Sequence, residues 1–175
     1  MAYQVLADQL QRLGVDLSPD NRKLVAAADF YTEVPSGSHI AVPSHRNQLG
    51  PWHHGLYIGD KRVIHMTGET KEDARVQQDT VNEFITGTSV IALVLYAEDA
   101  DADRQASVQA ALYLKDVLPT EDLYSITHFN CEHFAVLCRT GLKRYAPALL
   151  EVSAYMQSRA PPSRKAGKPT MQMLL

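Results

Sequence analysis

The sequence predicts an α+β protein in which a small antiparallel β-sheet packs against a cysteine-bearing helix, with a helical extension at the N-terminus. Residues 52–66 have a strand–turn–strand pattern centred on Gly59, which is typical of a β-hairpin. An almost continuous apolar run over 89–96, rich in β-branched residues, indicates a central strand. Asn130 is a good helix N-cap, and apolar residues at helical spacing follow it, so a helix is expected to begin at Cys131.

The N-terminal part of the chain has the residue pattern of two helices. Apolar residues at helical spacing predict a first helix over 2–13. Ser18 before Pro19 marks a second helix start, which the segment Leu24–Phe30 continues. We therefore expect residues 1–35 to form a helical extension outside the main domain.

The remaining segments are assigned from turn residues and apolar periodicity. They are a strand over 39–42 that ends at Pro43, a charged loop over 67–79, a segment at 81–85 that fits either a strand or a helical turn, a helix over 104–117, a weak helix over 148–156 and a tail from 158. The hairpin and the other two strands are then expected to form the sheet.

Length, charge and cysteine content exclude several classes of protein. At 175 residues the chain suits one domain, and its net charge of −3 gives no reason to expect nucleic acid as a partner. It has no apolar run long enough to cross a membrane and no recognisable secretion signal, so no transmembrane anchor is expected. Its two cysteines share one predicted helix and cannot easily form a disulfide, which favours a reducing, cytoplasmic setting.

The loop length of the hairpin decides which side chains share a face of the sheet. A two-residue loop would place His65 opposite His54, on the face that also carries Leu56. A loop with an odd number of residues instead brings His53 and His65 together, and we prefer this register because it keeps the other face apolar. In that register the two faces are made by Leu56, Ile58, Ile64 and Met66 and by His53, Gly55, Tyr57, Val63 and His65.

Cys131 is the candidate nucleophile of this chain. A thiol in the first turn of a helix lies where the aligned peptide dipoles favour a thiolate, so we expect its pKa to be lowered. Cys138, two turns further along the same helix, is expected to be a buried structural residue. His133 points away from Cys131 and is expected to fix the start of the helix through a hydrogen bond.

The seven histidines raise the alternative of a metal site. The sequence has no Cys-x-x-Cys pair and no His-x-x-x-His helix pattern, and the adjacent His53 and His54 lie on opposite faces of a strand, so they cannot both bind one ion. The glycines also lack the spacing of a phosphate-binding loop. We therefore expect neither a metal nor another cofactor.

Three segments together resemble the lecithin:retinol acyltransferase (LRAT) family, namely His53–Asp60, Val63–Met66 and Asn130–Phe134. This family includes the H-Ras-like suppressor phospholipase/acyltransferases and the picornaviral 2A proteins of the H-box/NC type. The family is related to NlpC-type, papain-like cysteine hydrolases by circular permutation, so the resemblance implies a permuted papain-like fold. It covers residues 36–142, which implies a catalytic domain there and a separate C-terminal part over 143–175.

The resemblance also implies roles for individual residues. Cys131 matches the family's nucleophile, His53 the general base, and His65 the histidine that orients this base. Tyr57 and Asn130 are weaker candidates for contacts with the substrate or with the oxyanion.

These matches imply a thiol-dependent acyltransferase or phospholipase that acts on acyl-glycerolipids through a thioester on Cys131. An acyl lipid is the expected substrate, with the membrane surface and a protein as further partners, and the expected location is cytoplasmic or peripheral to membranes. His54 stands where family members usually have Trp or Tyr, so no catalytic role is carried over to it. Two alternatives stay open, a permuted papain-like cysteine peptidase or amidase and a non-catalytic LRAT-like binding module.

Overall fold

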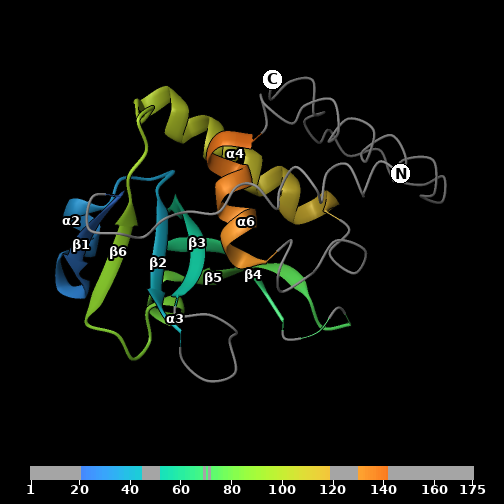
Figure 1. Cartoon of the computed structure of the whole chain (residues 1–175), viewed down its shortest axis with the longest axis horizontal. Coiled ribbons are helices and arrows are strands. Elements are labelled where there is room, and N and C mark those ends of the chain that lie inside the picture. Colours follow the sequence, from blue (N-terminus) through green and yellow to red (C-terminus); the bar gives the residue numbers. More distant parts are fainter. Residues whose placement is uncertain (1–20, 45–51, 69, 71, 119–129, 142–175) are drawn as a thin grey trace.

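The computed structural model describes residues 21–44, 52–68, 70, 72–118 and 130–141 of the chain (Figure 1). These residues form a mixed α+β fold around one six-stranded antiparallel sheet with the strand order β1-β6-β2-β3-β4-β5. The strands are β1 (Arg22–Ala26), β2 (His39–Pro43), β3 (Trp52–Gly59), β4 (Arg62–Thr67), β5 (Arg75–Thr80) and β6 (Val90–Val94). The predicted fold class is confirmed.

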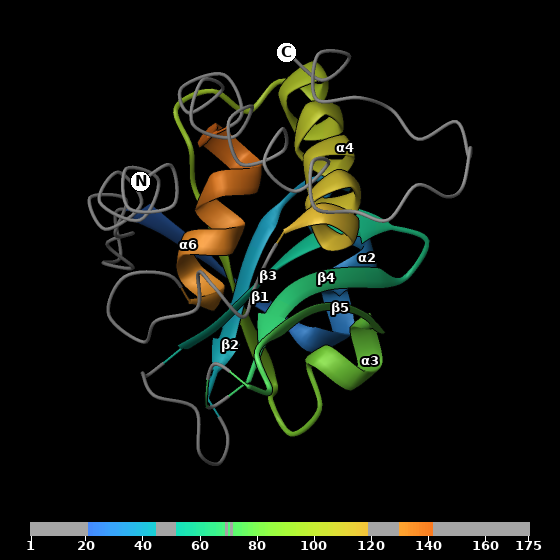
Figure 2. The same cartoon turned by 90° about the vertical axis from the view of Figure 1, so that its right-hand side faces the viewer.

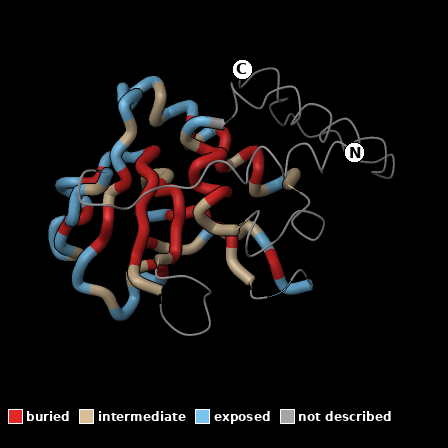
Figure 3. Tube along the Cα trace, in the orientation of Figure 1, coloured by how far each residue is buried: buried red, intermediate tan, exposed pale blue. Residues whose placement is uncertain are grey.

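Helices lie on both faces of this sheet. On one face are α4 (Asp101–Val117) and α6 (Cys131–Val136), and α6 continues into a π-helical turn, Leu137–Gly141 (Figure 2). The short helices α2 (Phe30–Glu33) and α3 (Val81–Phe84) pack on the other face. Because both faces are covered, the middle strands β2, β3 and β4 are buried along most of their length (Figure 3).

Each face of the sheet has its own hydrophobic core. The first core joins Leu56, Ile64 and Met66 of the β3–β4 hairpin to side chains of α4 and α6. The second core joins Tyr57 and Val63 of the same hairpin to side chains of α2 and α3. Alternate residues of the hairpin therefore point to opposite cores, as the period of two in a strand requires. We call these two sides the α6 face and the α3 face of the sheet.

The register of the hairpin confirms the predicted division of its side chains between two faces. Leu56 pairs with Ile64 and Tyr57 pairs with Val63, and the register shifts at a β-bulge between Tyr57 and Gly59. Gly59 has a φ of 87° in this turn, which glycine adopts without strain. The bulge adds one residue to β3 and so gives the hairpin the pairing expected for a loop with an odd number of residues.

Residues Leu24–Phe30 are not one helix, so this prediction was wrong. Arg22–Ala26 form β1, which pairs with β6, and the chain then makes a 3₁₀ turn over Ala27–Asp29 before α2. The alanine-rich sequence favours a helix locally, but hydrogen bonding to β6 and the burial of Val25 outweigh that preference. Part of the expected N-terminal extension is therefore a strand of the central sheet.

The charged segment 67–79 is not one loop, since Arg75–Thr80 form β5 at the edge of the sheet. An edge strand has fewer packing neighbours and accepts polar residues, so it lacks the apolar signal that marked the inner strands. The ambiguous segment at 81–85 begins as helix α3, which follows a capping box made by Thr80 and Glu83.

Some predictions concern segments that the structure does not describe. The helices expected over 2–13 and 148–156, and the tail from 158, lie outside the described residues. The division of the chain into residues 1–35, 36–142 and 143–175 stays a prediction. Within the described ranges, no helix combines the length and the apolar character needed to span a membrane.

Gly37 lies where the chain before β2 touches α4. Its φ is 88°, and a Cβ added there would stand 2.3 Å from the carbonyl oxygen of Arg104. We expect Gly37→Ala to lower the free energy of unfolding by about 2–4 kcal/mol, measured by urea denaturation, because a backbone clash adds to the strain of a positive φ. Gly87→Ala is the matched control, since Gly87 has a φ of 82° in an exposed turn. Equal losses of unfolding free energy in the two variants would contradict this prediction, because they would show that the backbone of Arg104 moves aside without cost.

Candidate active site

The first turn of α6 fixes the backbone that carries Cys131. Asn130 caps the helix, because its Oδ1 accepts hydrogen bonds from the backbone N–H groups of Glu132 at 3.0 Å and of His133 at 3.4 Å. Nδ1 of His133 lies 2.9 Å from the same oxygen and 3.4 Å from the backbone nitrogen of Asn130, which completes a capping box. The predicted cap and the predicted hydrogen bond of His133 are both confirmed.

Three polar side chains from neighbouring strands form a hydrogen-bonded chain on the α3 face. Nε2 of His53 in β3 lies 2.8 Å from Nδ1 of His65 in β4, and Nε2 of His65 lies 2.8 Å from Oδ2 of Asp79 in β5. Gln77 donates to the same oxygen of Asp79 at 2.8 Å. We call His53, His65 and Asp79 the Asp79 chain. Across the described ranges, no group of three or more His, Cys, Asp or Glu side chains is arranged to hold a metal ion.

The Asp79 chain determines which ring nitrogens carry hydrogen. The carboxylate of Asp79 only accepts hydrogen bonds, so Nε2 of neutral His65 carries a hydrogen and its Nδ1 has a free lone pair. His53 must then donate from Nε2 to that lone pair, which leaves Nδ1 of His53 without a hydrogen. This Nδ1 has no hydrogen-bond partner among the described residues. His53 therefore offers an unprotonated nitrogen, the state that a general base needs.

Burial keeps both imidazoles of this chain neutral. Burial is the main reason that the pKa of His53 falls to about 3. The neighbouring His65 and His54 lower this pKa further, and the charge of Asp79 raises it. Burial also lowers the pKa of His65, against the raising effect of Asp79. The Phe84 ring packs against both imidazoles, with centroid distances of 5.3 Å to His53 and 5.2 Å to His65. Neither ring is expected to be charged near neutral pH.

Cys131 approaches the hairpin from the α6 face. Its side chain packs against the first core, whereas His53 and His65 pack against Phe84 on the opposite face. The backbone N–H of His54 faces the sulfur, so the thiol adjoins the peptide that links His53 to His54. Within the described part of the chain, no hydrogen bond joins Cys131 to His53 or His65. The structure thus brings the two histidines together and sets the thiol beside the strand that carries His53.

Comparison with known proteins places this hairpin and helix in one family. The family model for lecithin retinol acyltransferase matches residues 32–144, which is more than half of the chain. The chain belongs to the lecithin retinol acyltransferase (LRAT) family. Lecithin retinol acyltransferase of Bos taurus is 29% identical over 119 residues, covering 51% of this chain and 49% of the relative. The chain therefore spans about half the length of this relative, and the region matched by the family model contains Cys131 and the whole Asp79 chain.

In this LRAT-family chain the predicted lowering of the Cys131 pKa is wrong. Burial raises the pKa of the thiol, and the backbone N–H groups of His54 and Glu132 offset only part of that effect. The start of the helix could be predicted from the sequence, but the extent to which packing buries the sulfur could not.

Alkylation of Cys131 should report this shift. Because burial disfavours the thiolate, we expect labelling by iodoacetamide to reach half of its maximal rate at a higher pH than for free cysteine in the same buffer. Cys138 is 3% exposed, so it should label only as the protein unfolds. Peptide mapping over a pH series distinguishes the two thiols. A midpoint for Cys131 below that of free cysteine would instead indicate an activated thiolate.

The structure gives Tyr57 a packing role. Its ring makes an edge contact with Phe30 at a centroid distance of 5.0 Å and is buried in the second core. These contacts lie on the α3 face and not beside Cys131, so they do not support the expected role at the oxyanion. Asn130 uses its side-chain oxygen as the helix cap.

Sequence reasoning missed three residues near the site. Asp79 was placed in a loop, although the capping box that follows it could have marked the end of a strand. His39 and Tyr96 were given no role, yet the two side chains are joined by a hydrogen bond of 2.8 Å on the α6 face. No local motif identifies His39 or Tyr96, because these two residues are far apart in the sequence and meet only in the folded sheet.

Proposed function

We propose that this chain is a thiol-dependent acyltransferase or phospholipase that acts on acyl-glycerolipids through a thioester on Cys131. Membership of the LRAT family supports an acyltransferase-type function. The observation that carries the proposal is the Asp79 chain, because it leaves an unprotonated Nδ1 on His53, the residue before His54, whose backbone N–H adjoins the sulfur. Nucleophilic acyl transfer needs a neutral imidazole that reaches the thiol. The ring of His53 packs on the α3 face and the sulfur lies on the α6 face, so the proposed proton transfer requires this ring to turn toward the sulfur.

In the first half-reaction, Nδ1 of His53 accepts the thiol proton while the sulfur attacks the ester carbonyl carbon of the lipid. The S–C bond forms, and the π electrons of the C=O bond move to the oxygen. Collapse of this tetrahedral intermediate restores the C=O bond and breaks the C–O bond of the ester. The departing alkoxide takes the proton from His53, which leaves a lysolipid and a thioester on Cys131.

In the second half-reaction, His53 removes a proton from an acceptor as the acceptor's oxygen or nitrogen attacks the thioester carbonyl carbon. The S–C bond then breaks, and the sulfur regains its proton from His53. Water as the acceptor makes the protein a phospholipase, and an alcohol or an amine makes it an acyltransferase. The acceptor that reaches the thioester therefore decides between the two activities.

The pKa shifts of the two partners bear on the timing of proton transfer. Burial raises the pKa of Cys131 and lowers that of His53 to about 3, so a resting thiolate–imidazolium pair is unfavourable. Proton transfer then accompanies the attack on the substrate instead of preceding it. In this scheme His65 and Asp79 hold the ring of His53 in one tautomer and one orientation.

Incubation with phosphatidylcholine in mixed micelles, followed by intact-mass measurement, tests the proposal. The expected result is release of lysolipid together with an added acyl mass that peptide mapping assigns to Cys131 and that hydroxylamine removes. Cys138 is the internal control and should carry no adduct. Lipid turnover without a thioester on Cys131 would reject the covalent route. Peptide or amide cleavage without lipid turnover would favour the peptidase alternative, and a stable protein complex without either activity would favour the binding module.

A lipid substrate would bring the protein to a membrane surface during turnover. We therefore propose a cytoplasmic protein that associates with membranes peripherally. Co-sedimentation with phosphatidylcholine vesicles checks this association, and a protein that stays in the supernatant at all lipid concentrations would point to a soluble acyl donor.

A further inference from the structure

A second polar chain lies on the α6 face of the sheet. Nε2 of His39 in β2 is 2.8 Å from Nδ1 of His54 in β3, and Nδ1 of His39 is 2.8 Å from the hydroxyl of Tyr96, shortly after β6. We call Tyr96, His39 and His54 the Tyr96 chain. His39 is fully buried, and His54 is 3% exposed. The Tyr96 chain and the Asp79 chain therefore end at consecutive residues, His54 and His53, on opposite sides of β3.

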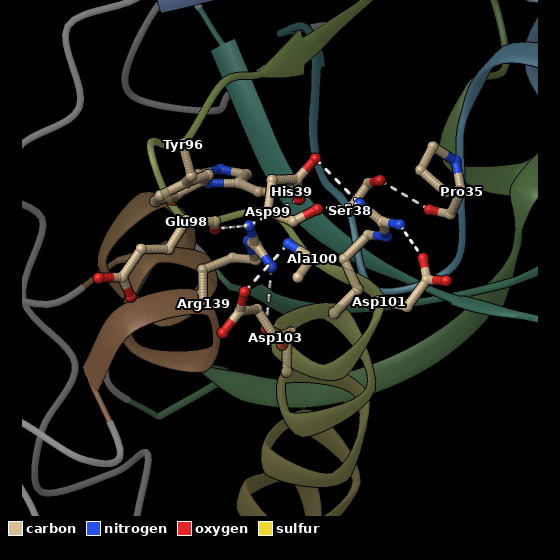
Figure 4. A network of polar contacts seen from close by, with 12 residues as sticks. Pro35, Ser38, His39, Tyr96, Glu98, Asp99, Ala100, Asp101, Asp103 and Arg139 are labelled. Atoms are coloured by element: carbon tan, nitrogen blue, oxygen red, sulfur yellow. Dashed lines mark hydrogen bonds and ion pairs between the residues drawn. The ribbon is translucent and has the colours of Figure 1, made fainter.

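Arg139, in the π-helical turn after α6, holds the far end of the Tyr96 chain (Figure 4). Its guanidinium lies over the Tyr96 ring at 4.6 Å and donates to Oδ1 of Asp99 at 2.9 Å and to the carbonyl oxygen of Glu98 at 3.0 Å. Burial raises the pKa of Tyr96, so the hydroxyl keeps its hydrogen, while the nearby cation opposes that shift and makes the hydroxyl a stronger donor.

The chemistry of the three groups fixes the direction of their hydrogen bonds. An imidazole nitrogen is a better acceptor than a phenol oxygen, so the Tyr96 hydroxyl donates to Nδ1 of His39. Nε2 of His39 then carries a hydrogen and donates to Nδ1 of His54. His54, whose Nδ1 acts as the acceptor, must carry its own hydrogen on Nε2. Burial lowers the pKa of both imidazoles, so neither takes up a second proton near neutral pH.

We propose that the Nε2–H of His54 donates a hydrogen bond to the oxyanion of the tetrahedral intermediate on Cys131, and that His39 and Tyr96 are positioning residues that fix this tautomer. The inference rests on the proposed function. His54 lies two residues before Leu56 in β3, and side chains two apart in a strand point to the same face. The side chain of His54 therefore lies on the α6 face, as Leu56 and Cys131 do. Its backbone N–H faces the Cys131 sulfur, and its Nε2 makes no hydrogen bond to another described residue.

The end groups of the two polar chains explain why adjacent histidines take different roles. The Asp79 carboxylate is an acceptor, and it leaves His53 with an unprotonated nitrogen. The Tyr96 hydroxyl is a donor, and it leaves His54 with an N–H. One acyl-transfer step needs both a base for the thiol proton and a donor for the developing oxyanion. Consecutive residues of β3 supply the two.

The tautomer of His54 is measurable without any lipid. Heteronuclear NMR spectra that correlate ring protons with labelled histidine nitrogens should show the Nε2–H form of His54 in the wild type. Tyr96→Phe removes the terminal donor and should let His54 populate both tautomers. A wild-type His54 that carries its hydrogen on Nδ1 would overturn the donor role, whatever the lipid assays give.

The rate constant for acylation of Cys131 tests the catalytic role. His54→Leu, which removes the N–H, should lower this rate constant by about 10²–10³-fold with little change in KM. His54→Gln keeps an N–H donor and should recover part of the loss, and thermal unfolding of each variant separates loss of the fold from loss of the donor. A folded His54→Leu variant that acylates at the wild-type rate would overturn the inference. If the wild type forms no acyl adduct, the proposed function fails and the oxyanion role with it, while the NMR spectra still decide whether His54 is a donor.

Discussion

Cys131→Ala should abolish the acyl adduct and lower lipid turnover by about 10⁴-fold or more. The substitution removes the atom that forms the thioester, so direct attack of water on the ester would have to replace the covalent route. The Cys131 side chain is partly exposed, and we expect the free energy of unfolding to change by about 1 kcal/mol or less. Lysolipid release and intact mass measure the first effect, and urea denaturation measures the second.

Cys138→Ala is the matched control, because it removes the other thiol of the same helical segment. Cys138 is buried in the first core, so its loss should lower stability by about 1 kcal/mol and leave the adduct on Cys131 in place. Turnover that survives Cys131→Ala but is lost in Cys138→Ala would reject Cys131 as the nucleophile.

The sequence allowed the hairpin and the cysteine helix to be predicted because their signals are local. Gly59 marks the turn between two β-rich segments, and Asn130 marks the helix start within a few residues of Cys131. The requirement for one apolar face then selected the register that joins His53 to His65. Each of these steps needs only neighbours in sequence and the geometry of one element.

The parts that were missed depend on segments far apart in the chain. β1 is a strand because β6 pairs with it, and β5 is a strand because β4 does, although neither has the apolar pattern of an inner strand. The Tyr96 chain includes a hydrogen bond between His39 and Tyr96, which are 57 positions apart in sequence. The pKa of Cys131 was predicted with the wrong sign because burial depends on how α6 packs on the sheet, which the helix start does not reveal.

Four histidines contribute to the two polar chains, and all four are buried and neutral. A neutral imidazole has one donor nitrogen and one acceptor nitrogen. When one nitrogen accepts a hydrogen bond the other must donate, so the group at one end of a chain determines which nitrogen of every ring carries the hydrogen. Protonation of any of these rings would turn an acceptor into a second donor and break that order. The arrangement of base and donor around Cys131 therefore depends on the low pKa values of these rings.

Acidification should destabilise the fold strongly for the same reason. The pKa values of His53 and His54 in the folded protein are about 3 and about 4, against an ordinary value of 6.5. Between pH ~6 and pH ~4 the unfolded chain binds up to two more protons at these sites than the folded protein, so the free energy of unfolding falls as the pH falls, by up to about 3 kcal/mol per pH unit. Burial shifts the pKa values of His39 and His65 in the same direction, which steepens the loss.

The expected loss over these two pH units is about 5 kcal/mol, comparable with the lower end of the ~5–15 kcal/mol that stabilises a typical domain, so we expect a steep fall in the free energy of unfolding. Urea denaturation at a series of pH values measures the slope. In the control variant His53→Gln the slope should fall by about 1.4 kcal/mol per pH unit, because glutamine does not titrate. A free energy of unfolding that stays constant from neutral pH down to pH ~5 would mean that the buried histidines keep ordinary pKa values. The tautomers assigned to His53 and His54 would then lose their physical basis, since both assignments require rings that stay neutral.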